Sequence, residues 1–176
     1  MYLKIFLNIL LIVFLALLQA SFVSALPSPF ANINILLVVL VYVLIVGSFE
    51  ISFIYALSFG FLMDMFSFMS FGSHIFGFLF SIVVANFLLV NFFTNRSFYA
   101  FLALILSASV LNFFIVYIYS NAISFFTDAD YIIFNQSFAT FAIKQLGLNM
   151  ALMLVLYYLT NFLNNRFRPV FLSTKK

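Results

Sequence analysis

Long apolar runs separated by short polar breaks extend over most of the 176-residue chain. Six runs can be marked, at 5–22, 33–48, 51–63, 74–93, 98–119 and 138–163. A helix that crosses the hydrocarbon core of a bilayer needs about 20 apolar residues, and most of these runs approach that length. The pattern therefore predicts an all-α polytopic membrane protein of about six transmembrane helices, folded as a single integral membrane domain over 1–176.

The breaks between runs carry ordinary helix-ending signals. Pro27 and Pro29 follow the first run, and proline removes a backbone donor and restricts the residue before it. A connection rich in Ser, Met and Phe occupies 65–72, a polar turn occupies 94–97, and a longer loop is expected at 120–136. The breaks are short, so we expect consecutive helices to cross the membrane in alternating directions.

Composition agrees with the membrane assignment and excludes several kinds of function. Hydrophobic residues make up 67% of the chain and charged residues 6%, whereas a soluble domain carries about 25% charged residues. The runs leave no room for a soluble catalytic head, a nucleotide-binding domain or a receiver domain. Cysteine is absent and His74 is the one histidine, so neither a metal site nor another cofactor is expected.

The basic residues predict the orientation. Cytoplasmic loops carry an excess of Lys and Arg, and an internal N-terminus places six of the seven basic residues on that side: Lys4, Arg96, Arg166, Arg168, Lys175 and Lys176. Lys144 is the exception. It is expected to snorkel at the outer end of the sixth helix, or to pair with Asp128 or Asp130 outside. Both termini are therefore predicted to be cytoplasmic.

The first run shares some features with a signal peptide, including a basic start and the small-x-small sequence Val23-Ser24-Ala25. Its apolar stretch is longer than the roughly 7–15 residues of a signal-peptide core, so we expect it to be a retained helix. Cleavage would leave five spans and the same topology for the rest of the chain.

Two carboxylates, Glu50 and Asp64, lie near membrane depth. Glu50 begins the third run, where the helix macrodipole favours a negative charge, although a contact with another helix or a partner is also possible. Asp64 is either a cap for the following turn or a polar contact that joins two helices or fixes a binding surface. Their separation is about 20 Å along one helix, so they cannot form an acid–base pair on one substrate.

Small residues accompany Asp64. Gly60 precedes it by one helical turn, so the two share a face, which we expect to meet another helix. Gly72 and Gly77 permit tight turns or close helix approach. His74 begins the fourth run and is expected to be structural, with a proton relay to Asp64 as the alternative.

Three asparagines interrupt the later runs: Asn86, Asn112 and Asn149. A carboxamide in hydrocarbon is unfavourable unless it is hydrogen-bonded, so these residues indicate either helix packing or a polar substrate pocket. No phosphate-binding loop, zinc-protease motif or serine-hydrolase motif is present, and enzyme activity is not expected.

The stretch from Phe59 through Gly60 to Asp64, followed by Phe71-Gly72-Ser-His74-Ile-Phe-Gly77, resembles the rod shape-determining protein MreD family. That family has a proline before its second helix, a third helix ending in Gly-x-x-x-Asp, and a glycine that opens the fourth. Pro29, Gly60 with Asp64, and Gly72 match these positions. The connection lacks the family's usual proline before the glycine. Phe30 follows the leading proline, where the family often has aspartate.

The resemblance implies a non-enzymatic component of the bacterial cell-elongation machinery in the inner (cytoplasmic) membrane. Family members bind the bitopic protein MreC, and they link MreB filaments to peptidoglycan synthesis by RodA and a class B penicillin-binding protein. The family fold is similar to the substrate-binding S-component of energy-coupling factor transporters.

That similarity defines an alternative function, an S-component that binds a vitamin or similar small molecule. Asp64, Asn112 and Asn149 would then line a pocket open to the outside. A generic scaffold without a ligand is a third interpretation.

Overall fold

The computed structural model describes residues 2–67, 69–93, 97–127 and 135–171, without the side chains of 2, 4, 5 and 163–171. Every regular element within this part of the chain is helical. In order, these elements are α1 (Tyr2–Leu17), the π-helical segment η1 (Leu18–Val23), the 3-10 turn η2 (Phe30–Asn32), α2 (Ile35–Val46), α3 (Phe49–Phe66), α4 (Ser73–Asn91), α5 (Phe98–Thr127) and α6 (Gln136–Phe171).

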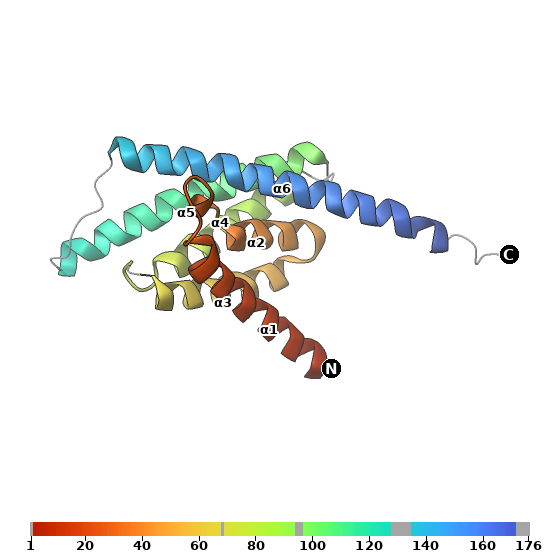
Figure 1. Ribbon diagram of the computed structural model, residues 1–176, viewed down its shortest axis with the longest axis horizontal. Helices are drawn as coiled ribbons and strands as arrows, with labels where there is room; N and C mark the ends of the chain where they lie inside the picture. The colour runs from red at the N-terminus through yellow and green to blue at the C-terminus, as the bar shows by residue number, and fades with distance from the viewer. Residues whose placement is uncertain (1, 68, 94–96, 128–134, 172–176) are drawn as a thin grey trace.

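The helices form a bundle around α2 (Figure 1). α4 packs against α3 on one side and α5 on the other, and α6 lies along α5. α1 packs against α3, and α2 contacts every other α-helix. The expected all-α membrane fold is confirmed at this level, because five helices are long and apolar enough to cross a membrane.

The second expected span, 33–48, differs from the prediction. Its helix is only 12 residues long, from Ile35 to Val46, which is about 18 Å against a hydrocarbon core of about 30 Å. α2 consists entirely of apolar residues and is buried on several sides, with Leu36, Leu40 and Ile45 fully enclosed. A helix that is apolar all round belongs in the interior of a bundle, where other helices rather than lipid surround it.

Other boundaries also differ from the sequence-based expectation. α3 continues beyond the expected end at 63 to Phe66, because Asp64 bonds to the next helix and does not end its own. α5 continues through Thr127, so the expected loop at 120–136 is partly helical. α6 begins at Gln136 and ends at Phe171, beyond the expected 138–163. An apolar pattern marks the part of a helix that fits the bilayer, not its polar or interfacial ends.

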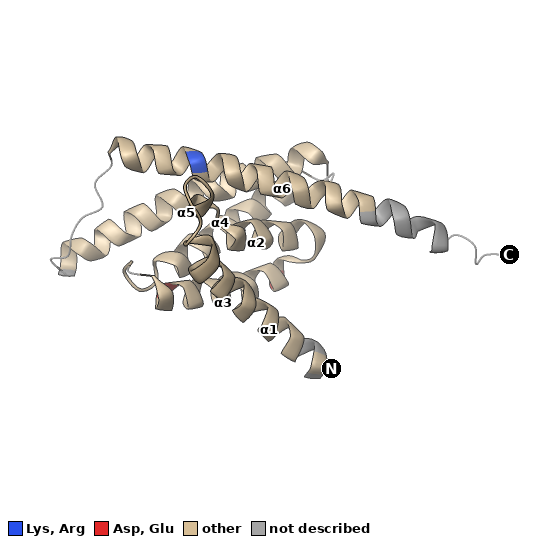
Figure 2. Ribbon diagram, in the orientation of Figure 1, with Lys and Arg blue, Asp and Glu red and all other residues tan. Residues whose placement is uncertain are grey.

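Charged side chains are rare on the described surface (Figure 2). Lys144 is exposed on α6, two turns from the start of the helix. Asp128 and Asp130, its possible partners, lie outside the described residues, as do the side chains of the basic residues that predict the orientation. The five longer helices present large apolar side chains outward, as expected for surfaces that face lipid.

Candidate functional site

Asp64 occupies the last turn of α3 and points at the start of α4. Its Oδ2 accepts hydrogen bonds from the backbone N–H groups of Gly72, at 2.9 Å, and Ile75, at 3.2 Å. Its Oδ1 accepts from the backbone N–H of His74, at 2.9 Å. The first N–H groups of a helix have no partner within the helix and carry partial positive charge. The carboxylate of Asp64 therefore caps α4 from the neighbouring helix.

His74 adds a side-chain contact to the same carboxylate. Its Nδ1 lies 2.9 Å from Asp64 Oδ1, and the side chain of Asp64 is 0% exposed against 18% for His74. An ionised carboxylate only accepts hydrogen bonds, so Nδ1 carries the proton and Nε2 is the free ring nitrogen. The pairing belongs to the proton-relay alternative as well as to the structural one. The three backbone bonds on the same carboxylate favour a structural role.

Gly60 sets the distance between α3 and α4. A Cβ atom built on Gly60 would lie 2.5 Å from the Cα of Ile75, a backbone atom that cannot move aside independently. Gly60 and Asp64 thus share the α3 face that meets α4, in agreement with the expectation from their spacing. Without this close approach, the carboxylate would not reach the start of α4.

Gly72 provides the turn that precedes α4. Its φ of +98° lies in the left-handed region, and a Cβ there would lie 2.6 Å from the hydroxyl oxygen of Tyr119. Tyr119 donates a hydrogen bond to the carbonyl of Phe71 at 3.1 Å, and the hydroxyls of Ser73 and Ser120 lie 3.1 Å apart. The α3–α4 connection is therefore held to α5 as well as to Asp64.

Glu50 lies apart from this site. It is exposed in the first turn of α3, while Asp64 is buried in the last turn. This position agrees with the macrodipole explanation for Glu50. The structure therefore brings together Gly60, Asp64, Gly72 and His74, and leaves Glu50 at the other end of the helix.

The three asparagines have different environments. Asn149 is fully buried; its Oδ1 accepts from the backbone N–H of Asn34 at 3.0 Å, and its Nδ2 donates to the Ser109 hydroxyl at 3.1 Å. Asn86 is half-buried on α4, and no hydrogen bond joins its side chain to another described residue. Asn112 is 6% exposed, and its Oδ1 is buried without a hydrogen-bond partner among the described residues.

A second polar cluster, at the start of α2, was not predicted. Gln19, within the π-helical segment η1, donates from Nε2 to the carbonyl of Ile33 and accepts at Oε1 from the N–H of Ile35, both at 2.8 Å. Asn34 caps α2 by accepting from the N–H of Leu37 at 3.0 Å. An Asn directly before an apolar run is a helix-start signal, and Gln19 is one of two amide residues inside its apolar run, with Asn8.

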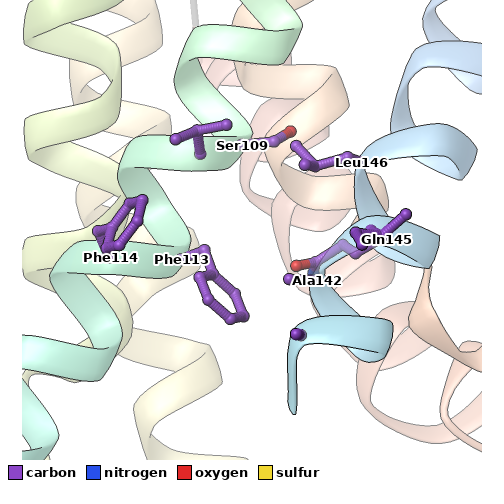
Figure 3. A pocket seen from close by; sticks show the side chains of 9 residues that line it. Ser109, Phe113, Phe114, Ala142, Gln145 and Leu146 are labelled. Carbon is purple, nitrogen blue, oxygen red and sulfur yellow. The ribbon is translucent and has the colours of Figure 1, made fainter. Parts of the chain in front are cut away.

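Two hollows lie beside α5. One is an apolar groove of about 210 Å³ between α5 and α6, with Ser109, Phe113 and Phe114 on one side and Ala142, Gln145 and Leu146 on the other (Figure 3). The other is a cavity of about 160 Å³ that reaches His74 and Asn112. Among the described residues, no group of three or more His, Cys, Asp or Glu side chains could hold a metal ion.

Comparison with known proteins gives no relative from which a function could be transferred. No family model, no curated protein and no solved structure matches the chain.

Proposed function

We propose that this protein is a non-enzymatic scaffold of the MreD type, which binds an MreC-like bitopic protein in the bacterial inner membrane. Through that partner it would link MreB filaments to the wall synthases RodA and a class B penicillin-binding protein. One observation supports the proposal most directly. The residues that carry the family resemblance, Gly60, Asp64 and Gly72, all serve to join α3 to α4.

The way Asp64 is used favours a binding role. Four hydrogen bonds occupy the two oxygens of its carboxylate, and its side chain is fully enclosed. A carboxylate in this state holds two helices in a fixed relation, so the outward faces of α3 and α4 have a defined shape. Partner transmembrane segments recognise such faces through close packing, because lipid provides little hydrophobic drive for helix association.

Co-purification tests the proposal. The tagged protein would be extracted from its native membrane in mild detergent, and the proteins recovered with it would be quantified by mass spectrometry. We expect MreC-like and wall-synthase proteins to be enriched. Recovery of a transporter ATPase with its membrane coupling subunit would instead support the S-component alternative and contradict the scaffold proposal.

A matched pair of variants links the result to the site. Asp64→Asn removes the buried carboxylate of α3, and Glu50→Gln removes the exposed one from the same helix. At equal membrane levels, partner recovery should fall with Asp64→Asn and persist with Glu50→Gln. Equal recovery with both variants would show that the α3–α4 junction does not shape the partner surface.

A further inference from the structure

The cavity that reaches Asn112 has the features of a small-molecule site. It is a partly open space of about 160 Å³ between α4, α5, α6 and the start of α2. Its walls include Phe113, Val116, Tyr117 and Phe138. The ring centroids of Phe113 and Phe138 lie 4.5 Å apart, and those of Tyr117 and Phe138 lie 5.3 Å apart, so a packed aromatic cluster forms one wall. Ligand sites are typically apolar hollows with a few placed polar groups.

Asn112 is one of the polar residues that line this cavity. Its carboxamide has no hydrogen bond to a described residue, although the residue is 6% exposed and Oδ1 is buried. Gly77 makes room for it, since a Cβ at that position would lie 2.6 Å from Asn112 Oδ1. Oδ1 is closed off from the cavity, so a molecule bound there would meet the other side of the amide, at Nδ2.

The other polar groups around the cavity are two carboxamides, a phenol hydroxyl and an imidazole. Asn34 and Gln145 contribute the carboxamides, Tyr117 the hydroxyl, and His74 the imidazole, whose Nδ1 already pairs with Asp64. The lining contains no Lys, Arg, Asp or Glu among the described residues. A site with donor and acceptor groups but no charge selects a neutral molecule that both donates and accepts hydrogen bonds.

The volume sets the size of that molecule. An apolar cavity of about 150 Å³ accommodates benzene, so the space here fits one six-membered ring with a small polar substituent. Water needs two to four polar partners at each site, and the aromatic wall provides few of them. A planar ring would instead stack against Phe113 and Phe138 while its polar edge meets Asn112.

We propose that the cavity at Asn112 binds a small, neutral, ring-shaped molecule whose polar edge both donates and accepts hydrogen bonds. The apolar groove between α5 and α6 provides a route to it from the lipid side. Phe113 and Gln145 line both the groove and the cavity, and Figure 3 shows them on opposite sides of the gap. This inference does not depend on the partner proteins proposed above.

Benzamide is a suitable probe, because its carbonyl oxygen can accept a hydrogen bond from the amide of Asn112 while its own N–H groups can donate to a neighbouring acceptor of the lining. Binding would be measured on the purified full-length protein in detergent by ligand-observed NMR, with toluene at equal free concentration as the apolar comparison. We expect saturable benzamide binding that is at least about tenfold tighter than toluene binding, since one satisfied buried hydrogen bond accounts for such a ratio. Non-saturable benzamide binding, or equal affinity for both probes, would overturn the proposal.

Three variants locate the site. Asn112→Leu should weaken benzamide binding at least about tenfold, because it removes the amide and keeps an apolar side chain of similar size. Phe138→Trp should abolish binding of both probes by filling the cavity while leaving Asn112 in place. Asn86→Leu removes an amide outside the cavity and should leave benzamide binding unchanged.

Each variant would first be checked for helix content and a single gel-filtration peak. If Asn112→Leu fails to fold, Phe138→Trp decides the question, because wild-type benzamide affinity in that variant would place the bound molecule elsewhere. Wild-type affinity in a folded Asn112→Leu variant would equally overturn the proposal.

Discussion

At the scale of single residues, the carboxylate of Asp64 accepts the backbone hydrogen bonds that water would accept at a solvent-exposed helix end. A helix start that is enclosed by protein has no solvent to satisfy its first N–H groups, and an unsatisfied buried group costs about 1–3 kcal/mol. Asp64 accepts hydrogen bonds from the N–H of Gly72, directly before α4, from the N–H groups of His74 and Ile75 in its first turn, and from the His74 ring. The charge is tolerated because every one of these partners is a donor.

We therefore expect Asp64→Asn to destabilise the protein by roughly 2–3 kcal/mol, because an amide presents its own donors to backbone donors and leaves buried N–H groups unpaired. The free energy of unfolding would be measured by titration with sodium dodecyl sulfate, followed by far-ultraviolet circular dichroism. Glu50→Gln is the control, since Glu50 is exposed at the start of the same helix. A similar loss in both variants would contradict the capping role.

Gly60 and Gly147 allow a paired test of helix approach. A Cβ at Gly60 would lie 2.5 Å from the Cα of Ile75, whereas a Cβ at Gly147 meets nothing within 4 Å. Gly60→Ala should therefore destabilise by about 1–3 kcal/mol through overpacking, even though alanine favours helix formation. Gly147→Ala should be neutral or stabilising by up to about 1 kcal/mol, from helix propensity alone. The same titration measures both, and a stabilising Gly60→Ala would show that α3 and α4 can separate freely.

At the scale of elements, α2 shows how a helix shorter than the bilayer fits into a membrane bundle. The chain before it consists of the π-helical segment η1, the 3-10 turn η2 and irregular backbone, and irregular backbone at membrane depth is tolerated only where protein surrounds it. Gln19 from η1 and Asn149 from α6 bond the backbone groups that this irregular stretch leaves free. The two side chains thus provide hydrogen bonds that further helical turns would otherwise provide.

From this arrangement we expect Asn149→Leu to destabilise the protein by roughly 1–2 kcal/mol, because the Asn34 N–H and the Ser109 hydroxyl lose their partner. Asn86→Leu is the matched control, since its amide has no bond to a described residue. It should be neutral, or stabilising if its side chain faces lipid. Thermal unfolding in detergent, followed by circular dichroism, compares the two. Equal midpoints would mean that the start of α2 is satisfied without Asn149.

Much of the element pattern could be predicted, because apolar runs determine helices in a membrane. The shared face of Gly60 and Asp64 could be predicted from helical spacing. The role of Gly72 could be predicted from the need for a turn between two helices. The short length of α2 was not predicted, although Asn34 directly before it and Gly47 directly after it are helix-end signals. The different environments of Asn112 and Asn149 also depend on which helices face each other, and spacing within one helix carries no such information.

At the scale of the whole molecule, the contacts place the helix ends in two groups. The cavity brings together Asn34 at the start of α2, Met69 after α3, His74 at the start of α4 and Phe138 at the start of α6. At the opposite end, Phe98 at the start of α5 packs on Tyr157, late in α6, with ring centroids 5.4 Å apart. Asn34, at the start of α2, belongs to the first group of helix ends, and Gly47 lies at the other end of α2. α2 therefore runs between the two groups of helix ends, as the longer helices do.

This arrangement predicts that α2 carries the chain across the membrane despite its length. The sequence contains no cysteine, so single cysteines can be introduced at four exposed positions: Phe30, Ser48, Met69 and Ser97. In spheroplasts, a membrane-impermeant maleimide should label Phe30→Cys and Met69→Cys directly, because the excess of basic residues predicts an external location for that end. Ser48→Cys and Ser97→Cys should be labelled only after permeabilisation.

The pairing of positions matters more than the absolute side. If both pairs exchange sides, the fold stands and the orientation predicted from the basic residues is wrong. If Phe30→Cys and Ser48→Cys react from the same side, α2 does not cross, and the chain spans the membrane five times. In that case Gln19, Asn34 and Asn149 would lie near an interface, where water could satisfy the start of α2, and Asn149→Leu should then have little effect. The labelling and stability experiments therefore test one physical claim. The claim is that this polar cluster provides, at membrane depth, the backbone hydrogen bonds that a longer helix would otherwise provide.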